Sequence, residues 1–316
     1  MLYDNYVKEF GSDVDMYEFW NLYLARDEAY RVRRKGVDLP KIPKGMDTNF
    51  RSPASDLEKN TAELIAKWNA QRVTECEQDL FAQARRLADA ERKLAVKQTK
   101  TALNEQRIAG NKVNQYKRWI ADAKRERPEP ARDNRIFPDS YAPLLIVENG
   151  KRLVRPMRYH LRPQGMNPSI DRTKAGRVSG TYNARRDNLE RFWRRQFGYT
   201  HGLMLADSFY EQVDDGLGGS KELKFRPRTG ETMFVACLWS KWTDPRGYLP
   251  DLYSFAAITD EPEPEVAAAG HDRTIINIKP EHVDAWLNPD PRNLDALYAI
   301  FDDKRHPYYE VVKEAA

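Results

Sequence analysis

The stretch TYNARRDNLERFWRRQFGYTHGLMLADSFYEQ, residues 181–212, predicts three elements in succession. A polar turn at 183–186 precedes an arginine-rich helix over 187–196, and an apolar strand over 204–210 ends on two aromatic residues. Glu211 follows that strand, where neighbouring aromatic rings would raise the pKa of its carboxyl group. A carboxyl with a raised pKa suits general acid–base chemistry. On this stretch alone, the simpler interpretation is a solvated residue just past a strand.

Segments on both sides extend this pattern into a family resemblance. The chain reads, in order, MRYHL (157–161), NARRD (183–187), LADSFYEQ (205–212) and HDRTI (271–275). This order resembles the SOS response-associated peptidases, which are also described as abasic-site processing proteins. That family usually has Met-Arg-Trp-Gly-Leu, Asn-Ala-Arg-x-Glu, Gly-Phe-Tyr-Glu-Trp and His-x-Arg-Met-Pro. No single segment is specific, but four in this order are, and the resemblance spans about residue 135 to the C-terminus.

The resemblance implies one pocket in which Asn183, Glu211 and His271 converge. In the family, the asparagine and the glutamate flank the N-terminal residue, and the histidine assists reaction at the sugar. An abasic site is an aldehyde in equilibrium with a closed ring, so ring opening and imine chemistry each need a proton delivered and removed. Glu211 and His271 could share that work. Taken alone, His271 is more simply a structural histidine, and its His-Asp-Arg context favours the site.

Residues of the same segments are candidates for binding DNA. We expect Arg158, Arg185 and Arg186 to clamp phosphates, because a planar guanidinium donates two hydrogen bonds at once. Tyr159 occupies the place of the family tryptophan and could stack on a base beside the lesion. Pro138 loosely matches the proline of a family Asn-x-Ala-Pro-Thr segment.

The N-terminus departs from the family pattern. Members begin Met-Cys, and the exposed cysteine captures the aldehyde as a thiazolidine, whereas this sequence begins Met1-Leu2. Cys76 and Cys237 have no free α-amine and would give at best a labile hemithioacetal. One hypothesis is that the true start lies upstream and supplies Met-Cys, which the absence of such a codon pair in the gene would refute. The competing hypothesis is a divergent member that keeps the DNA cleft without covalent chemistry.

Charge is concentrated in one part of the chain. Residues 151–196 carry thirteen Lys and Arg against three acidic residues, whereas the whole chain has a net charge of +4. Such a block indicates an anionic partner, although a solvated arginine-rich helix face is common. The block crosses several predicted elements and contains interleaved aromatic residues. Aromatic rings together with arginine are what single-stranded nucleic acid requires.

Composition limits the remaining classes. Mean hydropathy is −0.79, and no apolar run approaches the ~20 residues of a membrane span. The first residues lack the layout of a signal peptide, and two cysteines make no disulfide framework. No His, Cys or Asp spacing matches a recognised metal site. We therefore expect a cytoplasmic monomer without membrane contact, metal or cofactor.

Periodicity predicts an α+β fold in two parts. Residues 1–130 form a helical region, with helices over 1–36, 56–97 and 100–126, a loop over 37–53, and the last two helices paired as an antiparallel hairpin. Residues 131–316 form the β-rich core, which the resemblance identifies as a mixed β-barrel with short helices. Asn149-Gly150 between two apolar runs predicts a β-hairpin. Further strands are expected at 204–210, 223–225, 233–239, 253–259 and 274–278, and short helices at 281–286 and 294–301.

Together these features predict an abasic-site processing protein of the DNA-damage response. It would bind single-stranded DNA at abasic sites and, in a form with an N-terminal cysteine, crosslink to the lesion after autoproteolytic removal of Met, as a peptidase or lyase of this family. The alternative is a non-catalytic single-stranded nucleic-acid-binding module that uses the same basic and aromatic cleft. A metal-dependent hydrolase using Glu211, His271 and Asp207 is a weaker third hypothesis.

Overall fold

The computed structural model describes residues 2–32, 39–216 and 218–312. The chain divides into two compact units. The first comprises residues 1–22, 38–49 and 130–316, and the second comprises residues 23–37 and 50–129. The segments at 1–22 and 38–49 therefore belong with the β-rich core, although they come from the N-terminal part of the sequence.

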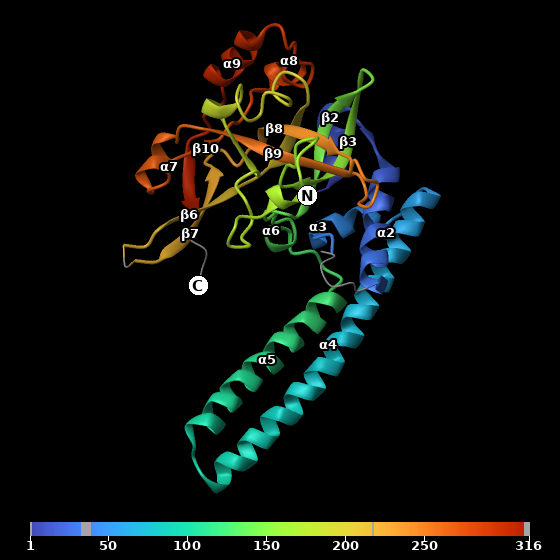
Figure 1. The fold of residues 1–316 in the computed structure, drawn as a ribbon, viewed down its shortest axis with the longest axis vertical. Helices are drawn as coiled ribbons and strands as arrows, with labels where there is room; N and C mark the ends of the chain where they lie inside the picture. The colour runs from blue at the N-terminus through green and yellow to red at the C-terminus, as the bar shows by residue number, and fades with distance from the viewer. Residues whose placement is uncertain (1, 33–38, 217, 313–316) are drawn as a thin grey trace. The chain divides into compact units, whose positions relative to one another are not determined.

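The first unit is built on a five-stranded closed barrel (Figure 1). The strand order is β3-β2-β5-β8-β9, and a parallel pairing of β3 with β9 closes the ring. Three short strands lengthen the barrel: β1 pairs with β3, whereas β4 and β10 pair with β9. The expected α+β fold with a mixed β-barrel core is thus confirmed. The barrel strands are Tyr141–Glu148 (β2), Lys151–Tyr159 (β3), His201–Ala206 (β5), Met233–Trp242 (β8) and Leu252–Asp260 (β9), and the short strands are Asp13–Val14 (β1), Asn183–Arg185 (β4) and Thr274–Ile275 (β10).

Local sequence explains the first hairpin of the barrel. Asn149 and Gly150 both have positive φ, at 53° and 74°, which matches the twist of a two-residue turn between antiparallel strands. Glu148 then pairs with Lys151, and the register holds along both strands to Tyr141 and Arg158. Alternate residues point inward, as the two-residue period of a strand requires. The buried core they form includes Ala142, Leu144, Ile146, Met157, Val235, Cys237, Phe255 and Ala257.

A separate three-stranded sheet corrects the prediction of one strand over 204–210. The barrel strand β5 ends at Ala206, and a new strand, β6 (Phe209–Asp214), begins after Asp207 and Ser208. It pairs with β7 (Ser220–Pro227), which pairs with β11 (Tyr309–Val312). Asp207 accepts a hydrogen bond from Thr232 at 3.0 Å, so this polar pair lies where the chain leaves the barrel. Glu211 therefore lies within a strand, opposite Leu223, and not just beyond one.

The predicted helix over 1–36 is interrupted. The helix α1 (Tyr3–Phe10) ends at Gly11, whose φ of 59° is the left-handed conformation that commonly ends a helix. The helix α2 (Met16–Val32) begins after Asp15, whose carboxylate accepts the N–H of Glu18 at 3.3 Å. Positions 33–36 of that prediction lie outside the described residues, as do 37 and 38 of the predicted loop. The rest of that loop contains the short helices α3 (Lys44–Asp47) and η1 (Thr48–Phe50).

The predicted helix over 187–196 does not form. Only a 3₁₀ turn, η3 (Arg186–Asn188), is regular, and successive turns follow it to residue 199. The side chain of Asn188 accepts the N–H of Phe192 at 3.4 Å, which competes with helical backbone bonding. Burial of Leu189 and Trp193 then fixes the turns through tertiary packing. The other short helices of this unit are α6 (Pro130–Asp133), η2 (Pro168–Asp171), α7 (Pro264–Ala268), η4 (Pro280–His282), α8 (Val283–Leu287) and α9 (Leu294–Asp302).

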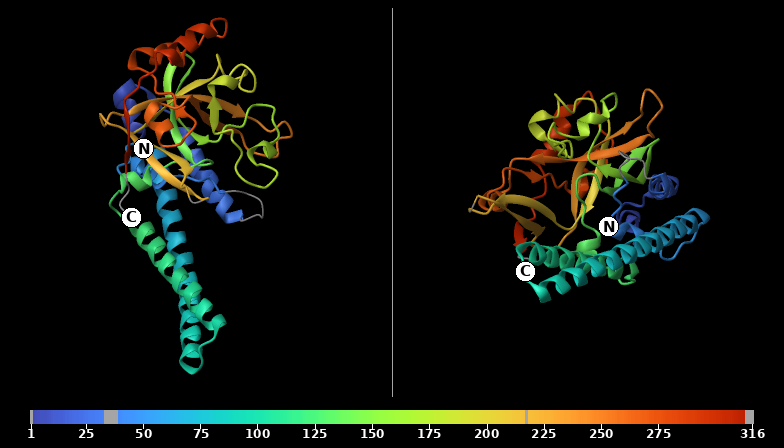
Figure 2. Two further views of the ribbon diagram at one scale, coloured as in Figure 1. Left: turned by 90° about the vertical axis from the view of Figure 1, so that its left-hand side faces the viewer. Right: turned by 60° about the horizontal axis from the view of Figure 1, so that its bottom comes forward.

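The second unit contains the predicted helical hairpin. The helices α4 (Asp56–Val96) and α5 (Lys100–Lys124) run antiparallel in every view (Figures 1 and 2). Ser55 and Glu58 form a reciprocal capping box at the start of α4. Thr99 accepts the N–H of Ala102 at 3.2 Å and caps α5. Within the described residues, neither of these long helices, nor any other, is apolar enough to cross a membrane.

Candidate acid–base and nucleic-acid site

Glu211 and His271 form a partly buried pair. Glu211 lies in β6, and His271 follows Gly270, whose φ of 92° turns the chain between α7 and β10. The carboxylate Oε2 lies 3.0 Å from the imidazole Nε2, and the side chains are only 19% and 11% exposed. Two residues that are 60 positions apart in sequence are thus in direct contact.

The hydrogen bonds around His271 fix the number of protons in this pair. Its Nδ1 lies 3.1 Å from the carbonyl oxygen of Arg273, and because a carbonyl can only accept, Nδ1 must carry a hydrogen. The contact between Nε2 and Glu211 then needs one further proton, held by either group. Burial raises the pKa of Glu211, against the opposing charges of His271 and Arg273. A raised pKa favours the protonated carboxyl, which can exchange its proton with the adjacent imidazole.

Asn183 and Tyr159 are neighbours along one edge of β9. Tyr159 pairs with Phe255 where the barrel closes, and Asn183 pairs with Ala257 two residues further on the same edge. This register lets the Tyr159 hydroxyl donate to Asn183 Oδ1 at 3.3 Å. Burial raises the pKa of Tyr159, with Cys237 and then Glu211 adding to the effect, so the phenol stays neutral.

Tyr159 and Arg273 connect the two pairs electrostatically. The charge of Glu211 raises the pKa of Tyr159, whereas the charge of Arg273 lowers the pKa of both Tyr159 and Glu211. Arg273 also lines a cavity together with Asn183. Of the three predicted catalytic residues, Glu211 and His271 are in direct contact, and Asn183 is bonded to Tyr159. The ring of Tyr159 packs against Tyr182 and Phe255, at centroid distances of 5.8 and 5.2 Å, and is half-buried.

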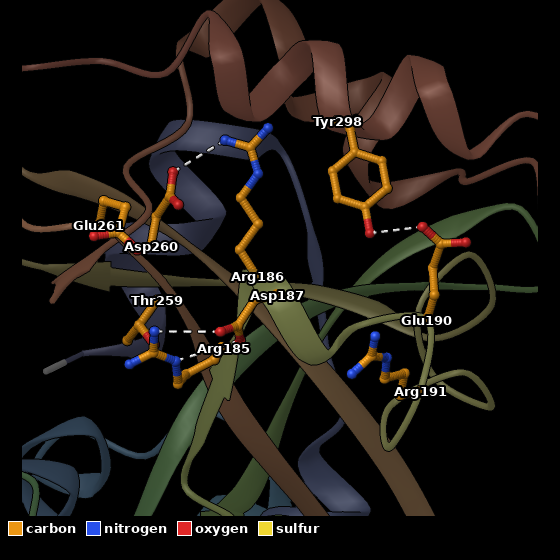
Figure 3. Close-up of a pocket in the computed structure, with 9 residues that line it drawn as sticks. All are labelled: Arg185, Arg186, Asp187, Glu190, Arg191, Thr259, Asp260, Glu261 and Tyr298. Carbon is orange, nitrogen blue, oxygen red and sulfur yellow. Dashed lines mark hydrogen bonds and ion pairs between the residues drawn. The ribbon is translucent and has the colours of Figure 1, made fainter.

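Two adjacent cavities lie beside this neighbourhood. The first has a volume of about 500 Å³, and the second, shown in Figure 3, of about 550 Å³. They share Arg185, Asp187 and Arg191, so one basic rim borders both. The first is lined by Gly180, Thr181, Asn183, Arg185, Asp187, Asn188, Arg191, Phe192, Trp193 and Arg273. The second is lined by Arg185, Arg186, Asp187, Glu190, Arg191, Thr259, Asp260, Glu261 and Tyr298.

The shared arginines can accept an anion. Arg185 is 42% exposed and contacts Asp187 at 3.3 Å and Asp272 at 3.8 Å, both at the surface. Exposed ion pairs of this kind contribute little free energy, so a phosphate could replace them. Arg191 is exposed, and among the residues the structure describes its guanidinium contacts no acidic partner.

The other predicted phosphate contacts are already engaged. The Arg158 guanidinium donates to Asp171 at 2.8 Å and to the carbonyl of His160, and is largely buried. Arg186 contacts Asp260 at 3.1 Å and also Asp302, as Figure 3 shows for Asp260. Both arginines therefore hold protein segments together. Pro138 is half-buried in the turn before β2, next to Asp139, whose N–H donates to the carbonyl of Tyr159 at 2.9 Å.

Two residues that sequence reasoning did not single out belong to this site. Arg191 lies in the arginine-rich stretch that was predicted as a helix, and Arg273 ends the His-Asp-Arg segment. Their charge was visible in the sequence, but only the turns at 189–199 and the loop before β10 place both on the cavity with Asn183. In the described part of the chain, no three His, Cys, Asp or Glu side chains gather closely enough to hold a metal ion.

Comparisons with known proteins relate this chain to one family. A family model described as SOS response associated peptidase (SRAP) matches residues 93–315. A solved structure from Bordetella bronchiseptica is 18% identical, with a TM-score of 0.44, and the match covers 57% of this chain and 87% of that one. A structure from Bacteroides thetaiotaomicron is 15% identical (TM-score 0.42, 55% and 74% covered), and a phage-related protein from B. bronchiseptica is 16% identical (0.41, 55% and 78%). No curated protein matches the sequence.

Proposed function

This chain belongs to the SOS response associated peptidase family, and from that membership we propose that it binds single-stranded DNA at abasic sites. The family name associates the protein with the response to DNA damage. The finer assignment rests on one observation, the partly buried Glu211–His271 pair, whose hydrogen bonds imply a single exchangeable proton. A pair of this kind has little value to a module that only binds strands, because burying an ionisable pair costs free energy.

The chemistry of an abasic site matches this pair. Opening the sugar ring moves a proton from the anomeric hydroxyl to the ring oxygen, and forming an imine removes a hydroxide as water. Each step needs an acid and a base in close succession, which Glu211 and His271 supply between them. Asn183, held by the hydroxyl of Tyr159, would orient a sugar oxygen or an attacking amine. In a form whose first residue is cysteine, the captured aldehyde would close to a thiazolidine crosslink, and autocatalytic removal of Met would precede it.

The strand would follow the basic rim. Arg185, Arg191 and Arg273 supply guanidinium groups that can pair with phosphates. Phe192 is partly exposed on the same cavity and offers an aromatic face for a base. The rim carries more arginine than acid on its first cavity, whereas the second also contains four carboxylates, so the first fits the DNA backbone better.

Three oligonucleotides of one sequence would test this proposal. One is intact, one carries a natural abasic site, and one carries a tetrahydrofuran analogue that lacks the aldehyde. Fluorescence anisotropy should show tighter binding to the aldehyde strand than to the analogue. Equal affinity for all three would favour the alternative, a non-catalytic strand-binding module. A denaturing gel of a form with N-terminal cysteine should show a heat-stable shifted band with the aldehyde strand alone.

A further inference from the structure

A second group of hydrogen-bonded side chains lies outside the pair described above. His160 is fully buried at the end of β3, with Nδ1 2.7 Å from Asp139 Oδ1 and Nε2 2.9 Å from Ser179 Oγ. Carboxylate, imidazole and hydroxyl are thus connected in the order that activates a serine nucleophile. None of these three residues was placed in a site from the sequence alone. His160 occupies the position at which the SOS response associated peptidase family usually has glycine.

The charges around Asp139 fix the direction of this relay. Burial alone would raise the pKa of Asp139, but hydrogen bonds from His160 and Arg172 outweigh it and hold that pKa below its usual range. Asp139 is therefore ionised and can only accept, so His160 Nδ1 carries the hydrogen. In the neutral imidazole, Nε2 is then the acceptor for the Ser179 hydroxyl. This is the tautomer that a general base requires.

The loop that carries Ser179 is held in place. The N–H of Ser179 donates to the carbonyl of Asp171 at 3.1 Å. The carboxylate of Asp171 is in turn held by Arg158 and Arg162, which gives those arginines a role in fixing the loop. Ser179 is half-buried, and the next two residues, Gly180 and Thr181, line the cavity of about 500 Å³.

Two backbone N–H groups follow the serine directly and could serve a developing oxyanion. The N–H groups of Gly180 and Thr181 have no acceptor within the described residues. Backbone donors of this kind stabilise the negative charge of a tetrahedral intermediate. Ordinary loop structure explains a buried histidine bound to a carboxylate, but it does not require a half-buried serine on the histidine's free nitrogen beside a cavity.

We propose that Ser179, His160 and Asp139 form a nucleophilic site that hydrolyses small carboxylic esters. Ser179 Oγ attacks the ester carbonyl while its proton passes to His160 Nε2, and Asp139 stabilises the imidazolium. The carbon–oxygen bond to the alcohol breaks, and the alcohol takes that proton. Water then attacks the acyl-serine, gives one proton to His160 and releases the acid, and Ser179 regains its proton. This proposal uses none of the catalytic or phosphate-binding side chains of the abasic-site proposal, although both sites border the cavity of about 500 Å³.

Covalent labelling of the whole chain by a fluorophosphonate probe tests the site. The probe should attach to Ser179, located by mass spectrometry of the digested protein, and p-nitrophenyl acetate should be hydrolysed. Ser179→Ala should abolish labelling, and His160→Gln should slow it by roughly 100-fold or more. Ser169→Ala removes an exposed serine from the same region and should change nothing. Ser179→Cys, which retains a nucleophile in the relay, should restore acyl transfer with thiol-reactive esters.

The outcomes separate this site from a purely structural role. If the three side chains only fasten the loop, the variants lower the unfolding temperature but the wild-type protein is never labelled, which overturns the proposal. Labelling of any residue other than Ser179 overturns it as well. Glu211→Gln should leave labelling unchanged, and Ser179→Ala should leave DNA affinity unchanged, so failure of one proposal does not imply failure of the other.

Discussion

Replacing Glu211 by glutamine removes the exchangeable proton and leaves the geometry in place. The amide has the shape of the carboxyl group and can donate to His271 Nε2 across the same 3.0 Å contact. His271 Nδ1 then keeps its bond to the carbonyl of Arg273. The variant should therefore fold and bind DNA, but neither member of the pair could pass a proton to the sugar.

The size of the effect follows from the step that is lost. General acid–base catalysis contributes about 10²- to 10⁴-fold to a rate, which corresponds to roughly 3 to 5 kcal/mol of activation free energy. The affinity for an intact strand should stay within about twofold of the wild-type value. Glu211 is mostly buried, and a carboxylate makes no favourable contact with a phosphate. Chemistry and binding should thus separate in one variant.

Trapping by cyanoborohydride on an abasic strand measures this separation. The rate of covalent band formation on a denaturing gel reports imine chemistry, and anisotropy reports affinity under the same conditions. Asp214→Asn is the matched control, since it neutralises an exposed carboxylate at the end of the same strand, where the side chain accepts the N–H of Gly216. A Glu211→Gln protein that is trapped as fast as wild type would refute the acid–base role. Parallel loss of affinity for every strand would refute it too.

Three further predictions concern phosphate contact, packing and pH. Arg185→Ala should weaken binding to all strands and reduce the slope of log K against log salt by about 0.7. Arg292→Ala makes an equal charge change away from both cavities and should alter neither the affinity nor the slope. Equal slopes for the two variants would exclude Arg185 as a phosphate clamp. Tyr6→Phe should lower the free energy of unfolding by roughly 2 to 4 kcal/mol in urea titrations. The reason is that the buried hydroxyl donates to the carbonyl of Pro143 at 2.8 Å and accepts from the N–H of Leu205 at 3.0 Å. Tyr17 is exposed, so Tyr17→Phe should change the free energy of unfolding by under about 0.5 kcal/mol. Because burial raises the pKa of Glu211, its protonated form stabilises the fold fully below its unfolded pKa of about 4, and that contribution is lost as pH rises through the folded pKa. Glu211→Gln should therefore gain stability relative to wild type as pH rises above about 4, and a constant difference would contradict this.

Local patterns in the sequence determined several features of this protein. The period of apolar residues and the caps at Ser55 and Thr99 specify the helical hairpin, since helix boundaries depend on neighbouring side chains. Asn149-Gly150 specifies the first barrel hairpin because both residues tolerate positive φ. The ordered segments from residue 157 to 275 identified the family and the residues that would form its site.

Tertiary structure decided what local signals could not. The residues at 187–196 have helical periodicity, but burial of Leu189 and Trp193 with the side chain of Asn188 makes them a series of turns. The break after Ala206 puts Glu211 inside a new strand, where it contacts His271. Arg158 could bind a phosphate by its residue type, yet its guanidinium already forms an ion pair with Asp171, thirteen residues away. Composition states which charges a segment carries, and the folded chain alone settles which of them are already neutralised by another part of the molecule.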